Sequence, residues 1–227
     1  MKHLATTATL LFALFISISI DAQTRQIGNF TGIRISTSVS VKLVKADSPR
    51  IEYKMLKGDD SSLITEVKGN NLIVKTKSGF GGWNNAKAKV IVYYTELNDI
   101  SVSAGATVKS DDPIRTQDMD IDVSSGSKAD LEVIAQTIDV DASSGATLKL
   151  EGSAKKAQYD ASSGSKISAK MMICDYVNAD VSSGATIKAH VNKKLNADAS
   201  SGGSIRYTGN TDDTSIDKGW SGQISRM

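Results

Sequence analysis

The sequence predicts an all-β protein: a single-stranded parallel β-helix, or solenoid, of about six coils of 18–21 residues with a β-rich N-terminal cap. The main observation is a phrase of small residues, most often Ser-Ser-Gly, that occurs six times, around Gly105, Gly126, Gly145, Gly164, Gly184 and Gly202. Consecutive glycines of this set are 21, 19, 19, 20 and 18 residues apart. A period of this size is typical of a solenoid, in which each coil buries its apolar face only by stacking on its neighbours.

The second observation is the alternation of apolar and polar residues on both sides of each glycine. Around Gly145 an apolar set alternates with a polar one: Val140, Ala142, Ala146, Leu148 and Leu150 against Asp139, Asp141, Ser143, Thr147 and Lys149. Period-2 alternation is the pattern of a strand with one buried face, whereas a helix needs apolar residues three and four positions apart.

The repeated phrase is interpreted as a corner that joins two strands of a coil. The residues that flank each glycine on the inward side are Ala, Ser or Gly, so we expect the coil to be narrow there. We expect the glycine to be required because a Cβ atom would crowd the bend. Successive coils should pair as parallel strands about 4.8 Å apart, with the corner hydroxyls hydrogen-bonded from coil to coil.

The first 22 residues have the pattern of a secretory signal peptide. Lys2 and His3 precede an apolar stretch over 4–20, and Ala22 is a small residue at the expected cleavage position. The alternative is an uncleaved membrane anchor, but about 17 apolar residues is at the short limit for a membrane span. We therefore expect export of a mature chain, residues 23–227, without stable insertion in a membrane.

Residues 23–100 alternate in the same way but lack the corner phrase. A turn signal at 68–71 predicts a hairpin between strands at 63–67 and 72–74. This part is expected to cover the first coil, since the ends of a solenoid expose unpaired strand edges.

The repeats occupy 101–210, and 211–227, which contains Trp220, is expected to form a C-terminal cap. A Gly-rich loop at 78–85 contains Trp83. The favoured interpretation of this loop is a local plug, because an exposed tryptophan needs a function to explain it. The alternative is a mobile loop that presents Trp83 for stacking on a sugar ring.

Composition excludes several functional classes. The net charge is +2, and both signs are spread along the chain, which argues against nucleic acid as a partner. Cys174 is the only cysteine, so an internal disulfide is impossible. We expect a small buried hydrophobe there, with a reactive or intermolecular thiol as the alternative. His190 is the one histidine beyond the leader, so the sequence offers no Cys-His nucleophile and no His-rich metal site.

One set of residues has a pattern suited to binding. The outward position four residues before the corner glycine is aspartate in five copies: Asp122, Asp141, Asp160, Asp180 and Asp198. Stacked about 4.8 Å apart, these carboxylates would repel one another unless cations compensate them. We expect that role for the basic residues after the glycines, Lys109, Lys128, Lys149, Lys166, Lys188 and Arg206. Calcium between neighbouring coils is the less favoured alternative, because each coil supplies one carboxylate.

Three segments resemble a known family. They are the entry at 30–43, the turn and strand at 69–74, and the segment 100–106 that precedes the Ser-Ser-Gly repeats. From about Gln26 to Gly222 the chain resembles the family called putative auto-transporter adhesin, head GIN domain. The resemblance implies a β-helix-like solenoid that is exported by a Gram-negative bacterium to the periplasm or the cell surface. It implies no catalytic or binding residues.

These observations leave three hypotheses about function. The favoured one is a non-enzymatic binding or adhesion module at the cell envelope, with a shallow groove between the Asp and Lys columns for an extended ligand such as a glycan. The Asp column and Trp83 are its candidate binding residues. The alternative is a structural envelope protein that self-assembles as a homo-oligomer or docks on an envelope protein. A carbohydrate-active enzyme is least favoured, because active sites break repeat symmetry whereas these aspartates follow it.

Overall fold

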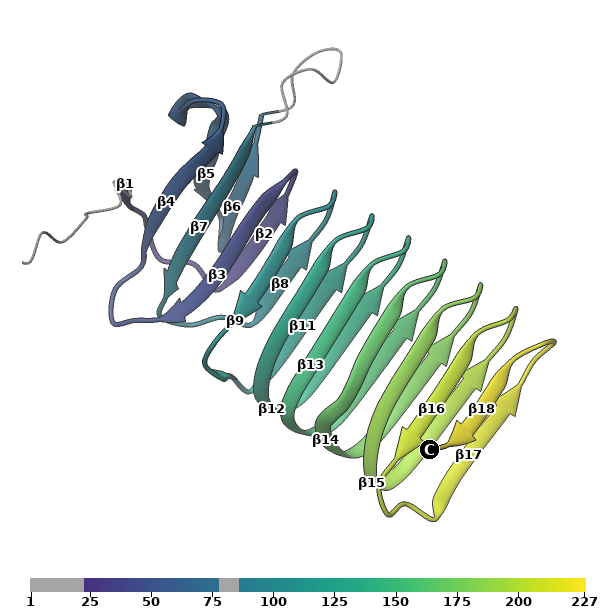
Figure 1. The fold of residues 1–227 in the computed structure, drawn as a ribbon. Coiled ribbons are helices and arrows are strands. Elements are labelled where there is room, and N and C mark those ends of the chain that lie inside the picture. The colour runs from purple at the N-terminus through teal and green to yellow at the C-terminus, as the bar shows by residue number, and fades with distance from the viewer. Residues whose placement is uncertain (1–22, 78–85) are drawn as a thin grey trace, which may run out of the picture.

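The computed structural model describes residues 23–77 and 86–227, and it confirms the predicted all-β solenoid (Figure 1). Besides one short 3-10 helix at Asp60–Ser62, the regular elements in the described residues are all strands. They are β1 (Gln23–Gln26), β2 (Gly32–Ser36), β3 (Val39–Lys45), β4 (Arg50–Lys57), β5 (Leu63–Lys68), β6 (Asn71–Thr76), β7 (Lys87–Tyr94), β8 (Asp99–Val102), β9 (Thr107–Ser110), β10 (Ile114–Arg115), β11 (Asp118–Val123), β12 (Lys128–Ala142), β13 (Thr147–Ala161), β14 (Lys166–Val181), β15 (Thr186–Ala199), β16 (Ser204–Thr208), β17 (Asp213–Lys218) and β18 (Gln223–Arg226).

The solenoid is a flattened coil with two sheets, which meet at the corners along one edge (Figure 1). What we call the pre-corner sheet contains the segments that run into the corners, which are β2, β8, β11, the second halves of β12–β15 and β17, together with the hairpin strands β5 and β6. The post-corner sheet contains the segments that leave the corners, which are β3, β9, the first halves of β12–β15, β16 and β18, together with β1, β4 and β7 of the N-terminal part. On the opposite edge the long strands β12–β15 bend and pass from one sheet to the other.

Each corner in the repeats is a tight turn with left-handed backbone. In the copy at 143–146, φ is 51° at Ser144 and 71° at Gly145, and the Ala146 N–H donates to the Ser143 carbonyl over 3.1 Å. Positive φ at both central residues defines a type I′ turn, which favours glycine. Seven corners between Ser103 and Gly222 close with this bond. A Cβ at Gly145 would meet nothing within 4 Å, so the expected crowding is wrong and backbone conformation is the reason for the glycine.

The coils are joined at the corners by backbone groups in every copy and, in two copies, also by the expected serine hydroxyls, which bond to the preceding coil. The Gly145 N–H, for example, donates to the Ser163 carbonyl of the next coil over 3.0 Å. Two inward corner serines are fully buried, and each donates to a main-chain carbonyl: Ser165 Oγ to Ala142 O, and Ser127 Oγ to Val102 O, both at 2.8 Å. Small inward residues thus allow the two sheets to converge without leaving an unpaired polar atom there.

The N-terminal part is a curled mixed sheet that continues both faces of the solenoid. β2 and β3 form a turn of their own, which stacks in parallel on β8 and β9. The predicted hairpin is confirmed, because β5 pairs with β6 in antiparallel register. β4 then pairs antiparallel with β7, and β1 with β4.

The C-terminal segment continues the solenoid as a further turn. β17 pairs with β15 and β18 with β16, both in parallel register. Trp220 lies at the corner between them and is 91% exposed. It therefore does not cover the end of the core as the sequence led us to expect. In the described residues, no helix has the length and apolar character needed to cross a membrane.

Candidate binding face

The predicted aspartate column exists and is one rung longer than expected. Parallel pairing places five predicted residues and one further aspartate in register on the outside of the pre-corner sheet: Asp122, Asp141, Asp160, Asp180, Asp198 and Asp217. Asp217 was missed because its corner reads Gly-Trp-Ser-Gly and lacks the Ser-Ser-Gly phrase.

A second polar column runs beside the first, two residues earlier in each strand. Its members are Asp99, Asp120, Asp139, Gln158, Asn178, Asn196 and Ser215. Two hydrogen bonds order its amides: Asn196 Nδ2 donates to Asn178 Oδ1 over 2.8 Å, and Gln158 Nε2 donates to Asp160 Oδ2 over 3.0 Å. The column was missed because its members differ in residue type, although all are carboxylates, amides or a hydroxyl.

A third column adds an aromatic ring to this surface. Asp118, Thr137, Lys156, Tyr176, Lys194 and Asp213 pair in register two residues earlier still. Tyr176 is 40% exposed, and the ammonium of Lys193 lies 5.7 Å from its ring centre. We call the surface formed by the three columns the binding face.

Shallow hollows follow the columns on the binding face. One of about 270 Å³ lies between Asp141, Asp160, Asp180 and Asp198 and the first serines of the corners. A second of about 390 Å³ is lined by Gln158, Asn178, Asn196 and neighbouring carboxylates. The surface therefore offers an elongated strip of oxygen and amide groups and not a single deep pocket.

The aspartates of the binding face repel one another. Partial burial, followed by the charges of Asp160 and Asp122, raises the pKa of Asp141 above its ordinary value. Partial burial and the charges of Asp160 and Asp198 do the same to the pKa of Asp180. At the N-terminal end of the second column, Arg34 partly offsets the negative charge, since its guanidinium lies 3.5 Å from the Asp99 carboxylate.

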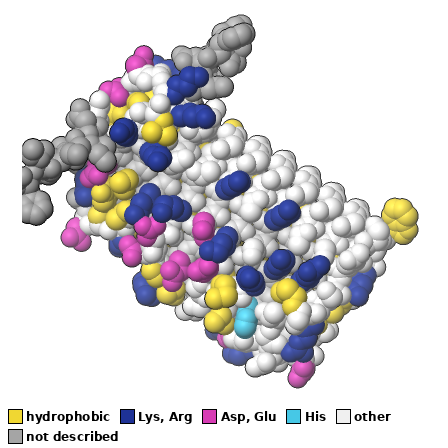
Figure 2. Space-filling model, viewed as in Figure 1, with side chains coloured by type: hydrophobic (Ala, Val, Ile, Leu, Met, Phe, Trp, Pro, Cys, Tyr) yellow, Lys and Arg dark blue, Asp and Glu magenta, His cyan; other side chains and the backbone are white. Residues whose placement is uncertain are grey.

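The expected compensation by the basic residues is wrong, because they lie on the post-corner sheet. Outward side chains of the two sheets point in opposite directions, so the Asp and Lys columns do not flank one groove. Lys149 instead pairs with Asp130 at 3.2 Å and Glu151 at 2.7 Å. Figure 2 views the molecule from the post-corner side and shows Lys and Arg side chains spread along it.

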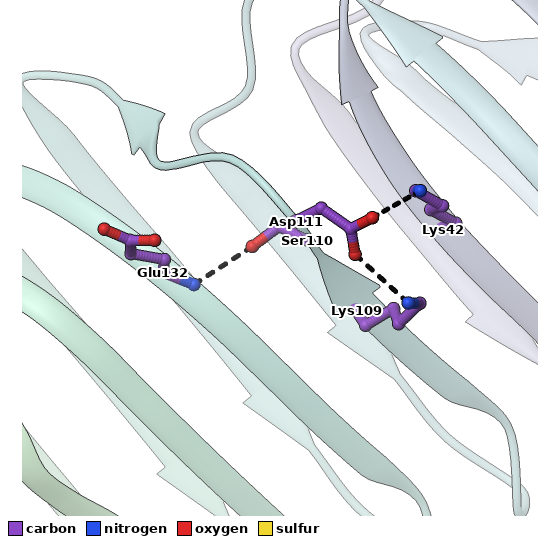
Figure 3. A network of polar contacts seen from close by, with 5 residues as sticks. All are labelled: Lys42, Lys109, Ser110, Asp111 and Glu132. Atoms are coloured by element: carbon purple, nitrogen blue, oxygen red, sulfur yellow. Dashed lines mark hydrogen bonds and ion pairs between the residues drawn. The ribbon is translucent and has the colours of Figure 1, made fainter.

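Figure 3 shows that lysines of the post-corner face near the start of the solenoid form ion pairs with an aspartate of the same face. The Asp111 carboxylate pairs with Lys42 and, at 3.1 Å, with Lys109. The adjacent Ser110 Oγ accepts a hydrogen bond from the Glu132 N–H over 3.0 Å. The hydrogen bonds from Lys42 and Lys109, together with the charges of both lysines, lower the pKa of Asp111, whereas the pKa values of Asp141 and Asp180 on the binding face are raised.

The other candidate residues give no chemical site. Trp83 lies outside the described residues. Cys174 is fully buried, as expected for a small hydrophobe. Across 23–77 and 86–227, no group of three or more His, Cys, Asp or Glu side chains is arranged to hold a metal ion.

Fold and surface together define the class of the protein: a two-sheet parallel β-solenoid with one acid- and amide-rich face and one lysine-rich face. The chain belongs to the family described as putative auto-transporter adhesin, head GIN domain, whose model matches residues 29–211. A comparison with curated proteins gives no match.

Solved structures share the fold along most of the chain. A putative adhesin from Bacteroides fragilis is 20% identical with a TM-score of 0.81, covering 91% of this chain and 96% of its own. A putative adhesin from Parabacteroides distasonis is 17% identical with a TM-score of 0.74, covering 91% and 96%. A protein named putative lipid binding protein from the same organism is 17% identical with a TM-score of 0.67, covering 92% and 98%. None of these names describes an enzyme.

Proposed function

We propose that this protein is an exported, non-enzymatic adhesion module of a Gram-negative cell envelope, and that its binding face holds an extended glycan. The observation that carries the proposal is the continuous strip of carboxylates and amides over successive coils. The predicted signal peptide at 1–22, which lies outside the described residues, supports export. Family membership supports adhesion.

The chemistry of the binding face suits sugar hydroxyls. Asn178 and Asn196 supply donors and acceptors side by side, and Asp180 and Asp198 supply acceptors on the same two strands. Groups repeat about every 4.8 Å along the solenoid, so an extended chain can contact several coils. Tyr176, two residues from Asn178, offers a partly exposed ring on which the apolar face of a sugar can stack.

The charge of the face predicts which glycans bind. Because its aspartates already repel one another, uronic acid or sulfate groups would add to that repulsion. Neutral and amino-sugar glycans should therefore bind, and acidic glycans should not.

A glycan array probed with residues 23–227 tests the proposal. We expect neutral or amino-sugar hits whose affinity falls about tenfold in both Tyr176→Ala and Asn178→Ala, roughly the loss of one stacking or hydrogen-bonded contact. Ser168→Ala, on the post-corner face, is the matched control and should bind as the wild type does. An array without hits, or hits that survive both substitutions, would contradict the proposal.

A second candidate function is assembly of copies into a layer, and the opposite charges of the two faces favour it. The binding face carries one aspartate of the aspartate column on each coil. The post-corner face carries one of these cations per rung in one of two adjacent columns: Lys109, Lys149, Lys188 and Arg206 in one, and Lys128 and Lys166 in the other. If copies were related by translation, the aspartate column of one copy would face the cations of the next, and both would have the spacing of the coils. Such a head-to-tail contact does not close into a ring, so it can add copies without limit.

Light scattering as a function of salt tests assembly. Screening shortens the reach of surface charges to about 3 Å at 1 M salt, so assemblies should form at low salt and dissolve at high salt. Lys166→Glu combined with Lys188→Glu should abolish them. A strict monomer at high protein concentration and low salt would rule this function out.

A further inference from the structure

The N-terminal end of the post-corner sheet is hollowed on its outer side. The hollow has a volume of about 660 Å³, within the range of small-molecule sites, and it crosses six adjacent strands: β4, β7, β3, β9, β12 and β13. Six strands span roughly 24 Å at the usual spacing. This groove lies on the side of the molecule opposite the binding face.

Two cross-strand columns of outward side chains line the groove. The first is Lys54, Lys89, Ser40, Thr107, Lys128 and Thr147, and the second is Glu52, Ile91, Lys42, Lys109, Asp130 and Lys149. Six of these twelve residues are lysines, whose methylene stems can line an apolar wall while the ammonium groups stay in water. Ile91 and the threonine methyl groups add to that wall.

The charges in the groove are unbalanced. Its two acids already have partners, since Glu52 lies 3.6 Å from Arg50 and Asp130 lies 3.2 Å from Lys149. Three lysines in the groove, Lys54, Lys89 and Lys128, form no ion pair with any described residue. Positive charge is therefore in excess along a groove whose walls are largely hydrocarbon.

Two of these lysines oppose each other directly. Lys54 on β4 and Lys89 on β7 are cross-strand partners in the antiparallel register. Like charges in this position destabilise a sheet. An anion between the two ammonium groups would remove that cost.

We propose that the groove binds a single-chain anionic amphiphile of the fatty-acid class. The carboxylate lies between Lys54 and Lys89, and the acyl chain runs across the strands past Ile91 and Thr107 towards Lys128. The excess of cations selects the anionic head, and the hydrocarbon walls select the chain. This site goes beyond the proposed glycan function and shares no residue with it.

Calorimetric titration of residues 23–227 tests the proposal with laurate below its micelle concentration. Saturable binding of one laurate is expected. Butyrate, which has the same head without the chain, should bind at least tenfold more weakly, since each buried methylene contributes about 0.8 kcal/mol. Dodecyl maltoside, which has the chain without the charge, should also bind at least tenfold more weakly. Equal binding of butyrate, or preference for the acidic polysaccharide alginate, would overturn the proposal.

Variants locate the site. Lys54→Gln and Lys89→Gln should each weaken laurate binding about fivefold to tenfold. Lys166→Gln, which removes a lysine of the same sheet that lies outside the groove and forms no ion pair with a described residue, should leave it unchanged. Equal affinity in the wild type and both groove variants would place the ligand elsewhere and overturn the proposal.

A charge reversal distinguishes a binding role from a structural one. Lys89→Glu creates an attractive pair with Lys54, so this variant should melt at a higher temperature than the wild type and yet lose laurate binding. Laurate should raise the melting temperature of the wild type and not that of the variant. A variant that is more stable and still binds laurate with wild-type affinity would refute the assignment of the head-group site.

Discussion

The phenolic oxygen of Tyr159 lies 3.6 Å from Sγ of Cys174 in the interior of the solenoid. Tyr159 comes from β13 and Cys174 from β14, and both side chains have no exposed surface. Burial raises the pKa of the thiol and raises that of the phenol well above its ordinary value. Both groups are therefore neutral at physiological pH.

This burial predicts an inert thiol. Because the thiolate is the nucleophile, a buried neutral Cys174 should not react with Ellman's reagent in the native protein over hours. In denaturant it should react within minutes, with one equivalent per chain. Rapid labelling of the native protein would mean that this part of the solenoid opens readily, and wild-type rates in Tyr159→Phe would show that the hydroxyl contact is not needed to protect the thiol.

Two glycines of one coil, Gly145 in the corner and Gly152 within β13, should tolerate alanine very differently. Gly145→Ala places a Cβ in open space at φ 71°, so it should cost about 1–2 kcal/mol in free energy of unfolding from backbone strain alone. Gly152→Ala, at φ 112°, would place its Cβ 2.1 Å from the Val133 carbonyl oxygen, so it should cost at least about 3 kcal/mol. Urea denaturation measures both, and similar costs would contradict the close approach of β13 to β12.

The partial burial of Asp141 and the repulsion from its neighbouring aspartates predict a pH-dependent stability. The folded state raises the pKa of Asp141, so ionisation of this group costs stability, and the cost is present above the folded pKa and disappears as pH falls towards the ordinary value of 3.8. Asp141→Asn should therefore raise the melting temperature at pH 7 by about 1–2 °C, equivalent to roughly 0.5 kcal/mol, and by less near pH 4.

Asp130→Asn is the control for that experiment. Asp130 accepts from Lys149 over 3.2 Å on the other face, so its loss should give no gain in stability at pH 7. A destabilised Asp141→Asn variant would show that repulsion does not dominate in the column.

The exposed corner tryptophan should contribute nothing to stability. Trp220 is 91% exposed, and surface substitutions of this kind usually change the free energy of unfolding by less than about 0.5 kcal/mol. Trp220→Ala should thus melt within about 2 °C of the wild type. Ile224, buried in the same turn, provides the contrast, since Ile224→Ala should cost about 2 kcal/mol or more.

The sequence allowed the solenoid to be predicted because each coil repeats one local code. The alternation around Gly145 separates inward from outward residues, and the small inward residues Ala146 and Ser165 identify where the sheets converge. The first turn was harder to recognise, because Thr37 and Ser38 adopt positive φ without a glycine.

The surface was predicted less well for a geometric reason. The alternation of apolar and polar residues predicts correctly that Asp141 and Lys149 both point outward. The corner between them, however, joins two sheets whose outer faces point in opposite directions. Because Asp141 and Lys149 are close in the sequence, the sequence suggested that they flank one groove. The fold instead places the two side chains on opposite sides of the molecule. The groove beside Lys54 and Lys89 depends on the pairing of β4 with β7, which no local pattern reveals.

Because the coils are equivalent, the number of coils can change during evolution. Thr147 and Lys166 occupy the same place in consecutive turns, so excising 147–165 would join Ala146 to Lys166 with the preceding strand still facing a similar neighbour. Loss or duplication of one unit changes the length by about 4.8 Å and leaves the cross-section intact. The number of units, and with it the length of any ligand that the molecule can span, is thus open to adjustment by unequal recombination within a single gene.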